Sequence, residues 1–213
     1  MQRTLQPELL DSLPPDDPAA QHNRRDLLLT NRIAGNHRWF ARTLPSLLRT
    51  GTVLELGAGT GELGLRLIRA GLAVDGLDRW PRPAAWPADR AWHMEDLLTF
   101  DRYDGYTAMI GNLIFHQFSA ADLAAIGRKL TRAADVIVAC EPTRRASSQL
   151  LYRTLGPLLG ANYVSLHDAH VSIAAGFRGD ELPRALGLDL AAWRIRVTTT
   201  LLGMYRMTAV RRP

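Results

Sequence analysis

The sequence predicts an α/β fold with a seven-stranded, mostly parallel sheet and helices on both faces, and three observations support it. Short apolar, β-prone runs alternate with amphipathic helical patterns, which is typical of parallel strands joined by crossover helices. The first run passes directly into a glycine-rich turn and then a helical pattern. The chain ends in two alternating strands joined around Gly203, which predicts an antiparallel hairpin.

The central elements follow from the same patterns. Between the second and third strands, Pro81, Pro83 and Pro87 forbid a regular helix, so that connection is expected to be largely loop. Segment 160–190 is rich in glycine and histidine and is harder to assign. The expected strands are 52–56, 72–77, 91–94, 106–110, 135–140, 193–199 and 204–210, with helices at 62–70, 123–130 and 144–159.

The part before the first strand divides into an arm and helices. Residues 1–20 gather prolines and aspartates at 14–18, a composition that resists helix and strand alike, and predict a flexible arm. Within 21–50 apolar residues recur at mostly helical spacings, broken near Gly35 and Pro45. Two short helices are therefore expected there.

Composition excludes several classes of protein. Lysine and arginine number 26 against 21 acidic residues, a net charge of +5, but the arginines are scattered, so a nucleic-acid partner is not favoured although phosphate binding stays open. Cys140 is the only cysteine, which excludes an internal disulfide framework and a multi-cysteine metal site. No apolar run approaches the ~20 residues that span a bilayer, and no signal-peptide pattern is seen. We expect a cytoplasmic protein with a single domain over 21–213.

The glycine-rich turn after the first strand is the main functional signal. Gly57, Gly59 and Gly61 allow a sharp turn and bring backbone amides close to a ligand at the start of a helix. The spacing from Gly59 to Gly64 also satisfies the GxGxxG pattern of dinucleotide-binding folds. In those folds the first glycine follows the strand directly, which would put Glu62 where the third glycine belongs. The register therefore argues against a nicotinamide or flavin site.

Carboxylates at the ends of the first two strands indicate a cationic, ribose-containing ligand. Glu55 would repel a pyrophosphate but suits a cation, although it could instead bond to nearby loop amides. Asp78 ends the second strand, where its oxygens can accept both ribose hydroxyls, or it could simply initiate a turn. Asp75 competes for this role but falls inside the strand. S-adenosylmethionine, which has an amino group, a sulfonium and no phosphate, fits this pattern.

Residues around the third strand could complete a nucleoside site. Asp96 could accept a hydrogen bond from an adenine amino group, or cap the helix that follows it. Its neighbour Glu95 leaves the exact position open. Trp80 or Trp86 could cover the adenine face or pack on the core.

Two segments resemble a known family. Segment 53–61 (VLELGAGTG) resembles the first motif of class I S-adenosylmethionine-dependent methyltransferases, and 110–118 (IGNLIFHQF) resembles their fourth motif in its small-molecule form. Asp78 and Asp96 match their acidic residues after strands two and three. The resemblance implies a Rossmann-like fold, S-adenosylmethionine as cofactor and S-adenosylhomocysteine (SAH) as product. The implied cofactor-binding residues are Glu55, Gly57, Ala58, Gly59, Gly61, Asp78, Arg79, Glu95, Asp96, Leu97 and Asn112.

Three residues are candidates for catalysis. His116 follows the fourth strand, where the methyl group is expected, and could act as a general base, or could cap or pack the next helix. His167 and Asp168 form a second polar cluster within 141–190, a segment expected to close over the site as a lid, and Asp168 could orient a histidine. His167 and His170 lack a third partner, so no metal is expected.

Short motifs in the second half indicate the acceptor. Segments 140–145 and 162–177 resemble bacterial methyltransferases found with type III polyketide synthases, which implies a phenolic-lipid or quinone-type acceptor. The leucine-rich helix at 150–159 also favours a hydrophobic one. We expect in-line methyl transfer to a small aromatic phenol or quinol. An RNA or DNA methyltransferase, a non-catalytic S-adenosylmethionine-binding protein and a dehydrogenase are the alternatives, although 111–114 lacks the Pro-Pro-aromatic turn that base methylation usually needs.

Overall fold

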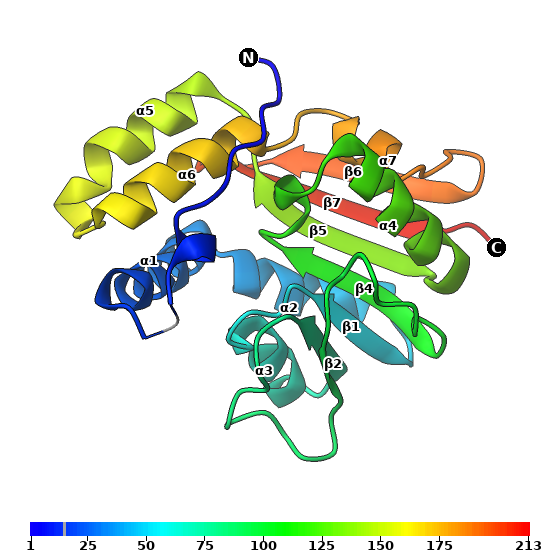
Figure 1. The fold of residues 1–213 in the computed structure, drawn as a ribbon. Helices are drawn as coiled ribbons and strands as arrows, with labels where there is room; N and C mark the ends of the chain where they lie inside the picture. Colours follow the sequence, from blue (N-terminus) through cyan, green and yellow to red (C-terminus); the bar gives the residue numbers. More distant parts are fainter. Residues whose placement is uncertain (15) are drawn as a thin grey trace.

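The predicted strands form one sheet. A computed structural model describes residues 1–14 and 16–213, and within them seven strands lie in the order β3-β2-β1-β4-β5-β7-β6 (Figure 1). β1 to β5 run parallel, and β7 is antiparallel to both β5 and β6, as predicted. The strands are β1 (Thr52–Leu56), β2 (Ala73–Asp78), β3 (Trp92–Met94), β4 (Tyr106–Asn112), β5 (Val136–Pro142), β6 (Trp193–Thr199) and β7 (Met204–Arg211).

The strand order reverses between β1 and β4. Leu56, the last residue of β1, lies in register with Leu77 of β2 on one side and Gly111 of β4 on the other. α3, which follows β1, and α4, which follows β4, cover opposite faces of the sheet, so the carboxyl ends of these two strands lie at a topological switch point. In parallel α/β sheets, ligands bind at such a switch point.

Helices cover both faces of the sheet. Leu54 of β1 belongs to a buried cluster with α4 and α7, whereas Val53 belongs to one with α2 and α3, because successive side chains point to opposite faces. None of the described helices is long and apolar enough to cross a membrane. The helices are α1 (Pro18–Ala34), α2 (Asn36–Leu47), α3 (Glu62–Arg69), α4 (Ala120–Ala133), α5 (Ala146–Leu155), α6 (Tyr163–Ala175) and α7 (Glu181–Ala185), with 3₁₀ turns η1 (Leu10–Ser12), η2 (Phe115–Gln117) and η3 (Pro157–Leu159).

The N-terminal part differs from the flexible arm expected over 1–20. α1 begins at Pro18, because the fixed φ of proline suits the first helical position and Asp17 caps the turn. Further upstream, the backbone N–H of Thr4 donates to the carbonyl of Ala174 in α6 at 3.2 Å. This segment therefore packs along the domain. Pro15, part of the proline-rich run, lies outside the described residues.

Segment 141–190, expected to be a lid, divides into two parts. α5 and α6 pack on each other, and α6 packs on α1 (Figure 1). By contrast, Leu182 of α7 and the following Leu186 are buried in the core beside α4. The stretch that was hard to assign thus contains one helix that lies beside α1 and one that belongs to the core.

Gly127 offers a test of the packing between α4 and the end of α7. A Cβ on Gly127 would collide with the backbone oxygen of Leu186, which cannot swing aside. Gly127→Ala should therefore lower the free energy of unfolding by about 1–3 kcal/mol in urea denaturation, although alanine favours a helix interior. Arg128→Ala, at the exposed next position, should change it by less than about 0.5 kcal/mol. An unchanged midpoint for Gly127→Ala would contradict this packing.

Candidate active site

The glycine turn folds back onto the end of β2. The backbone N–H groups of Gly57 and Ala58 both donate to the carbonyl of Leu77, at 2.9 and 3.1 Å. Gly57, Gly59 and Gly61 have φ values of 64°, 56° and 80°, a left-handed conformation that glycine adopts without strain. A Cβ on Gly59 would meet nothing within 4 Å. A ligand can therefore approach the backbone closely at this glycine.

Asp78 stands beside that open space. Its Oδ2 accepts a hydrogen bond from the N–H of Gly59 at 2.7 Å, and its Oδ1 accepts one from the N–H of Trp80 at 2.8 Å. Each carboxylate oxygen has two lone pairs, so both oxygens retain acceptor capacity. The carboxylate is thus held at the end of β2 while it can still bind hydroxyl groups.

The next two carboxylates, which the sequence left as alternatives, point to different partners. Oδ2 of Asp96 lies 4.0 Å from the guanidinium of Arg79, and its other oxygen accepts from the backbone N–H two residues on. Leu97 is only 6% exposed. The carboxylate of Glu95 instead pairs with Arg102. The side chain of Asp96 therefore lies near Arg79, just after β2, and that of Glu95 is engaged by Arg102.

Glu55 lies beneath the glycine turn. It is on the face of β1 that packs against α3, and its Oε2 is 2.6 Å from the place that a Cβ on Gly64 would take. Burial raises the pKa of Glu55 well above its usual value, opposed by a hydrogen bond from the backbone of Gly64. Within the described residues, Oε2 has no hydrogen-bond partner. Direct contact of Glu55 with a ligand stays a prediction.

Three asparagines meet at the end of β4. Nδ2 of Asn112 and Nδ2 of Asn36 both donate to Oδ1 of Asn31, at 3.1 and 3.0 Å. The Oδ1 atoms of Asn112 and Asn36 are buried with no partner in the part of the chain that the structure describes. Gly111, next to Asn112, pairs with Leu56, so the cluster adjoins the glycine turn. Unpaired carbonyl oxygens suit a ligand that donates hydrogen bonds, such as an ammonium group.

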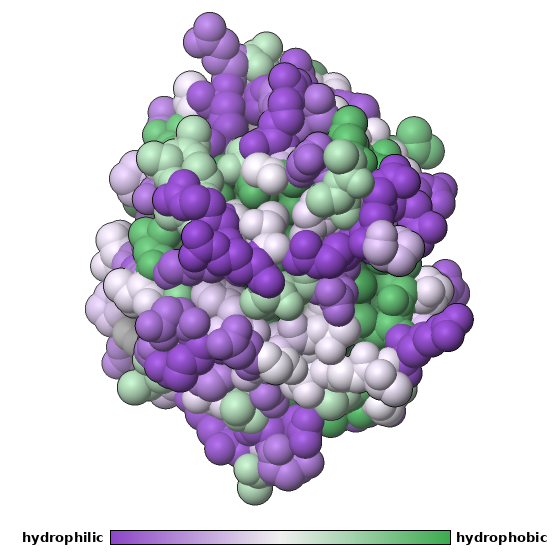
Figure 2. All heavy atoms as spheres, turned by 90° about the vertical axis from the view of Figure 1, so that its right-hand side faces the viewer, coloured by the Kyte–Doolittle hydropathy of each residue, from purple (hydrophilic) through white to green (hydrophobic). Residues whose placement is uncertain are grey.

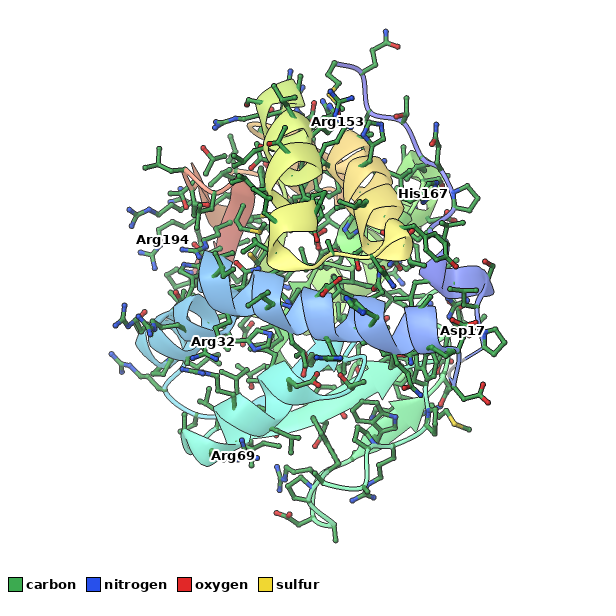
Figure 3. All side chains as sticks on the ribbon, turned by 90° about the vertical axis from the view of Figure 1, so that its left-hand side faces the viewer. Asp17, Arg32, Arg69, Arg153, His167 and Arg194 are labelled. Carbon is green, nitrogen blue, oxygen red and sulfur yellow. The ribbon has the colours of Figure 1, made fainter. Side chains whose placement is uncertain are left out.

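The polarity of α1 is the signal that the sequence analysis missed. Its buried residues include Asn23 and Asn31, whereas Leu28, Leu29 and Ile33 are 38% to 51% exposed. Figure 3 shows α1 crossing the molecule between α5 and α6 on one side and α3 on the other. Hydrophobic periodicity assigns leucines to the core, so it could not identify a helix whose inner face is polar. This inner face supplies Asn31 to the asparagine cluster at the end of β4.

His116 is held between two carboxylates. Its Nδ1 lies 2.7 Å from Glu141 Oε2, and its Nε2 lies 3.2 Å from Glu8 Oε1. Glu141 is fully buried and also accepts from the backbone N–H groups of Ile114, Phe115 and His116. Burial alone would lower the pKa of His116, but the hydrogen bonds with Glu141 and Glu8 raise it to about 10. At neutral pH His116 is an imidazolium, and the predicted role as a general base requires loss of that proton.

Asp168 and His167 lie on α6 and face the N-terminal segment. The carboxylate of Asp168 accepts from the backbone N–H groups of Leu9 and Leu10, at 2.7 and 3.1 Å. Nδ1 of His167 lies 3.1 Å from Asp168 Oδ1. Asp168 therefore fastens the N-terminal segment to α6. A catalytic role for either residue stays a prediction.

A hollow of about 300 Å³ lies between the N-terminal segment, η2 and α6. Its lining includes Glu8, Asp11, His116 and Ser172. Another hollow, of about 340 Å³ and including Thr52, lies at the amino ends of β1 and β4, the opposite edge of the sheet from the glycine turn. The described residues contain no group of three or more side chains placed to hold a metal ion.

Comparisons with known proteins identify the fold. No protein-family model and no curated protein matches the chain. The plantazolicin methyltransferase BpumL, in complex with SAH, superimposes with a TM-score of 0.69 at 11% identity over 93% of this chain and 92% of that one. The pyocyanin biosynthetic protein PhzM gives 0.60 at 21% identity over 92% of this chain and 60% of that one. A protein of echinomycin biosynthesis gives 0.60 at 20% identity over 83% and 81%. The chain has the Rossmann-like fold of class I methyltransferases.

The raised pKa of His116 predicts a pH dependence of stability. Because the folded state binds this proton more tightly than the unfolded chain, the stabilisation is complete below the unfolded pKa of about 6.5 and is lost as the pH rises through about 10. Urea denaturation from pH 6 to pH 10 should show stability falling across this window. His116→Gln should flatten that fall, and equal slopes in the two proteins would contradict the assignment.

Proposed function

We propose that this chain is an S-adenosylmethionine-dependent methyltransferase acting on a small, hydrophobic aromatic acceptor of the phenol or quinol type. The observation that carries this proposal is the glycine turn, held to Asp78 through Gly59 at the switch point of the sheet. A ligand with a ribose and a cationic end but no phosphate suits this arrangement. The SAH complex of the similarly folded BpumL supports the choice of cofactor.

The residues around the switch point fit this cofactor. Asp78 would accept the ribose hydroxyls, Asp96 the adenine amino group, and Leu97 would contact the adenine ring. The unpaired Oδ1 of Asn112 would accept a hydrogen bond from the ammonium group. When bound, the cofactor supplies an electrophilic methyl group on a positively charged sulfur. We propose no metal.

The task left to the chain is to align the acceptor. In-line displacement needs a nucleophile about 3 Å from the methyl carbon, so a rigid acceptor site accounts for much of the rate. The hollow beside His116 lies next to the turn after β4, where this alignment would occur. Because His116 already carries a proton, it cannot take one from the acceptor. An acceptor that must be deprotonated would lose its own proton to water or enter the site as an anion.

Two alternatives differ in what they bind. On the side of the molecule away from α1, hydrophilic residues are interspersed with apolar ones (Figure 2), which does not favour a nucleic-acid stripe on that face. Binding to RNA or DNA that falls steeply with salt would support a nucleic-acid methyltransferase. The engagement of His116 by two carboxylates favours a non-catalytic binding protein as the second alternative. A cofactor that binds without ever losing its methyl group would support it.

Asp78 provides the direct test of the cofactor. Asp78→Asn keeps the size of the side chain but removes its charge and half of its acceptor oxygens, so SAH binding should weaken by at least about tenfold in calorimetry. Asp101→Asn, an exposed position, should bind SAH within about twofold of the unaltered protein. Binding of NADH in place of SAH would replace the proposal with a dehydrogenase.

Asn112 tests the recognition of the amino-acid end. The ligand 5′-methylthioadenosine shares the nucleoside with SAH but lacks the ammonium and carboxylate groups. Asn112→Ala should weaken SAH binding about tenfold and leave 5′-methylthioadenosine within about twofold. Asn23→Ala, which removes a buried asparagine of α1 whose Nδ2 bonds to Asp168 and not to this cluster, is the control and should not separate the two ligands. Equal weakening of both ligands by Asn112→Ala would indicate a general disturbance instead.

A further inference from the structure

The side chain of Glu8 occupies the outward face of His116. Its Oε1 lies 3.2 Å from His116 Nε2, and the hydroxyl of Ser172 donates to the same oxygen. Glu8 belongs to the N-terminal segment, which crosses α6 before reaching η1 and α1 (Figure 1). One anionic oxygen thus receives two hydrogen bonds from η2 and α6, and it comes from outside the sheet and its covering helices.

His116 requires an anion at this place. Its Nδ1 donates to Glu141, which is fully buried and held by three backbone N–H groups. The imidazolium side chain is only 4% exposed, so its Nε2–H is the second donor of a buried cation. A buried charge with one partner removed is strongly destabilised. A group that replaces Glu8 at His116 Nε2 must therefore be negatively charged or be a strong hydrogen-bond acceptor.

The hollow beside Glu8 has the size and lining of a small-molecule site. Its volume of about 300 Å³ is at the lower end of the range for such sites and suits a single aromatic ring. Leu5, Pro7 and Val171 contribute apolar surface, and His116 and Ser172 contribute converging donors. Apolar walls with a few oriented polar groups are typical of pockets for small ligands.

The charges around the hollow favour an anionic ligand that takes the place of Glu8 over one that binds beside it. Asp11 also lines the hollow, and burial followed by the negative charge of Glu8 raises its pKa. Besides His116, the guanidinium of Arg3 is close, donating to the carbonyl of His116 at 3.0 Å. A further anion beside Glu8 and Asp11 would be repelled, whereas an anion in place of Glu8 leaves the net charge of the site unchanged.

We propose that this hollow binds the methyl acceptor, and that the acceptor carries an anionic oxygen, a phenolate or a carboxylate, which takes the place of Glu8 Oε1 at His116 and Ser172. The identification of the ligand as a methyl acceptor rests on the proposed function, whereas the anion site stands on its own geometry. A phenol bound here is held as its phenolate, because the neighbouring imidazolium stabilises the anion. His116 and Ser172 are then acceptor-binding residues, and the Glu8 carboxylate occupies the anion site when no acceptor is bound.

Three probes that share a nitrobenzene ring and differ in the group at position 4 test this site. Calorimetric titration of the full chain uses 4-nitrophenol above its pKa, 4-nitrobenzoate, and the neutral 4-nitroanisole. Glu8→Ala removes the competing carboxylate and should tighten binding of at least one anionic probe by fivefold or more, with 4-nitroanisole changed less than twofold. The absorbance of bound nitrophenolate reports its ionisation. The anionic probe that gains more tells whether the site prefers phenolate or carboxylate.

Asp11→Ala is the matched control, because it removes a second carboxylate from the same hollow, whereas the hydrogen bonds to His116 Nε2 and Ser172 are made by Glu8. It should not reproduce the gain. Adding Ser172→Ala to Glu8→Ala should reverse most of it. The proposal would be overturned if Glu8→Ala tightened the binding of both anionic probes by less than fivefold. It would also be overturned if Asp11→Ala tightened anion binding as much as Glu8→Ala does, or if Glu8→Ala tightened the binding of the neutral probe equally.

Two further measurements keep the result interpretable. Glu8→Gln removes the charge but retains the size of the side chain, and it replaces Glu8→Ala if circular dichroism shows that the alanine variant is unfolded. Each titration is run with and without SAH. Failure of SAH to bind would count against the proposed function, whereas the anion gain measured without SAH would still decide for or against the anion site.

Discussion

The carboxylate of Glu141 fixes the turn after β4, and the candidate site depends on that turn. It lies at the end of β5 and accepts hydrogen bonds from three successive backbone N–H groups and from the imidazole of His116. Leu113, just before the turn, has a φ of 61°, a left-handed conformation that costs about 1–2 kcal/mol for a residue with a side chain. Four hydrogen bonds to one carboxylate offset this strain and part of the cost of burying the charge. Asn112 and His116 are consequently held on either side of the turn.

A buried negative charge then governs the chemistry nearby. Glu141 keeps the proton on His116, and the resulting cation draws a second carboxylate, Glu8, to its other nitrogen. The same residue that looks like a base in the sequence becomes a fixed positive charge in the fold. For the proposed methyl transfer, placement of charge and acceptor is more consistent with this geometry than proton removal by His116.

Residues 1–14 and 16–35 form one wall of this region. α1 brings Asn31 to the end of β4, and the segment before it brings Glu8 to His116. Asp168 ties that segment to α6. The sheet supplies the glycine turn and the acidic residues that follow its strands, while elements at the start of the chain supply the Asn31 amide and the Glu8 carboxylate. A polar inner face on α1 is the physical reason that its leucines remain exposed.

Local chemistry determined much of this protein. The seven strands, the glycine turn and the position of Asp78 follow from β-prone runs, positive φ and strand ends, which are properties of adjacent residues. Only the tertiary structure could decide which of Glu95 and Asp96 faces Arg79, since neighbours in sequence can point to different partners. It also decided that His116 is charged. That state depends on Glu8 and Glu141, which are far from His116 in sequence, and no local pattern records which carboxylates the fold will bring to a buried imidazole.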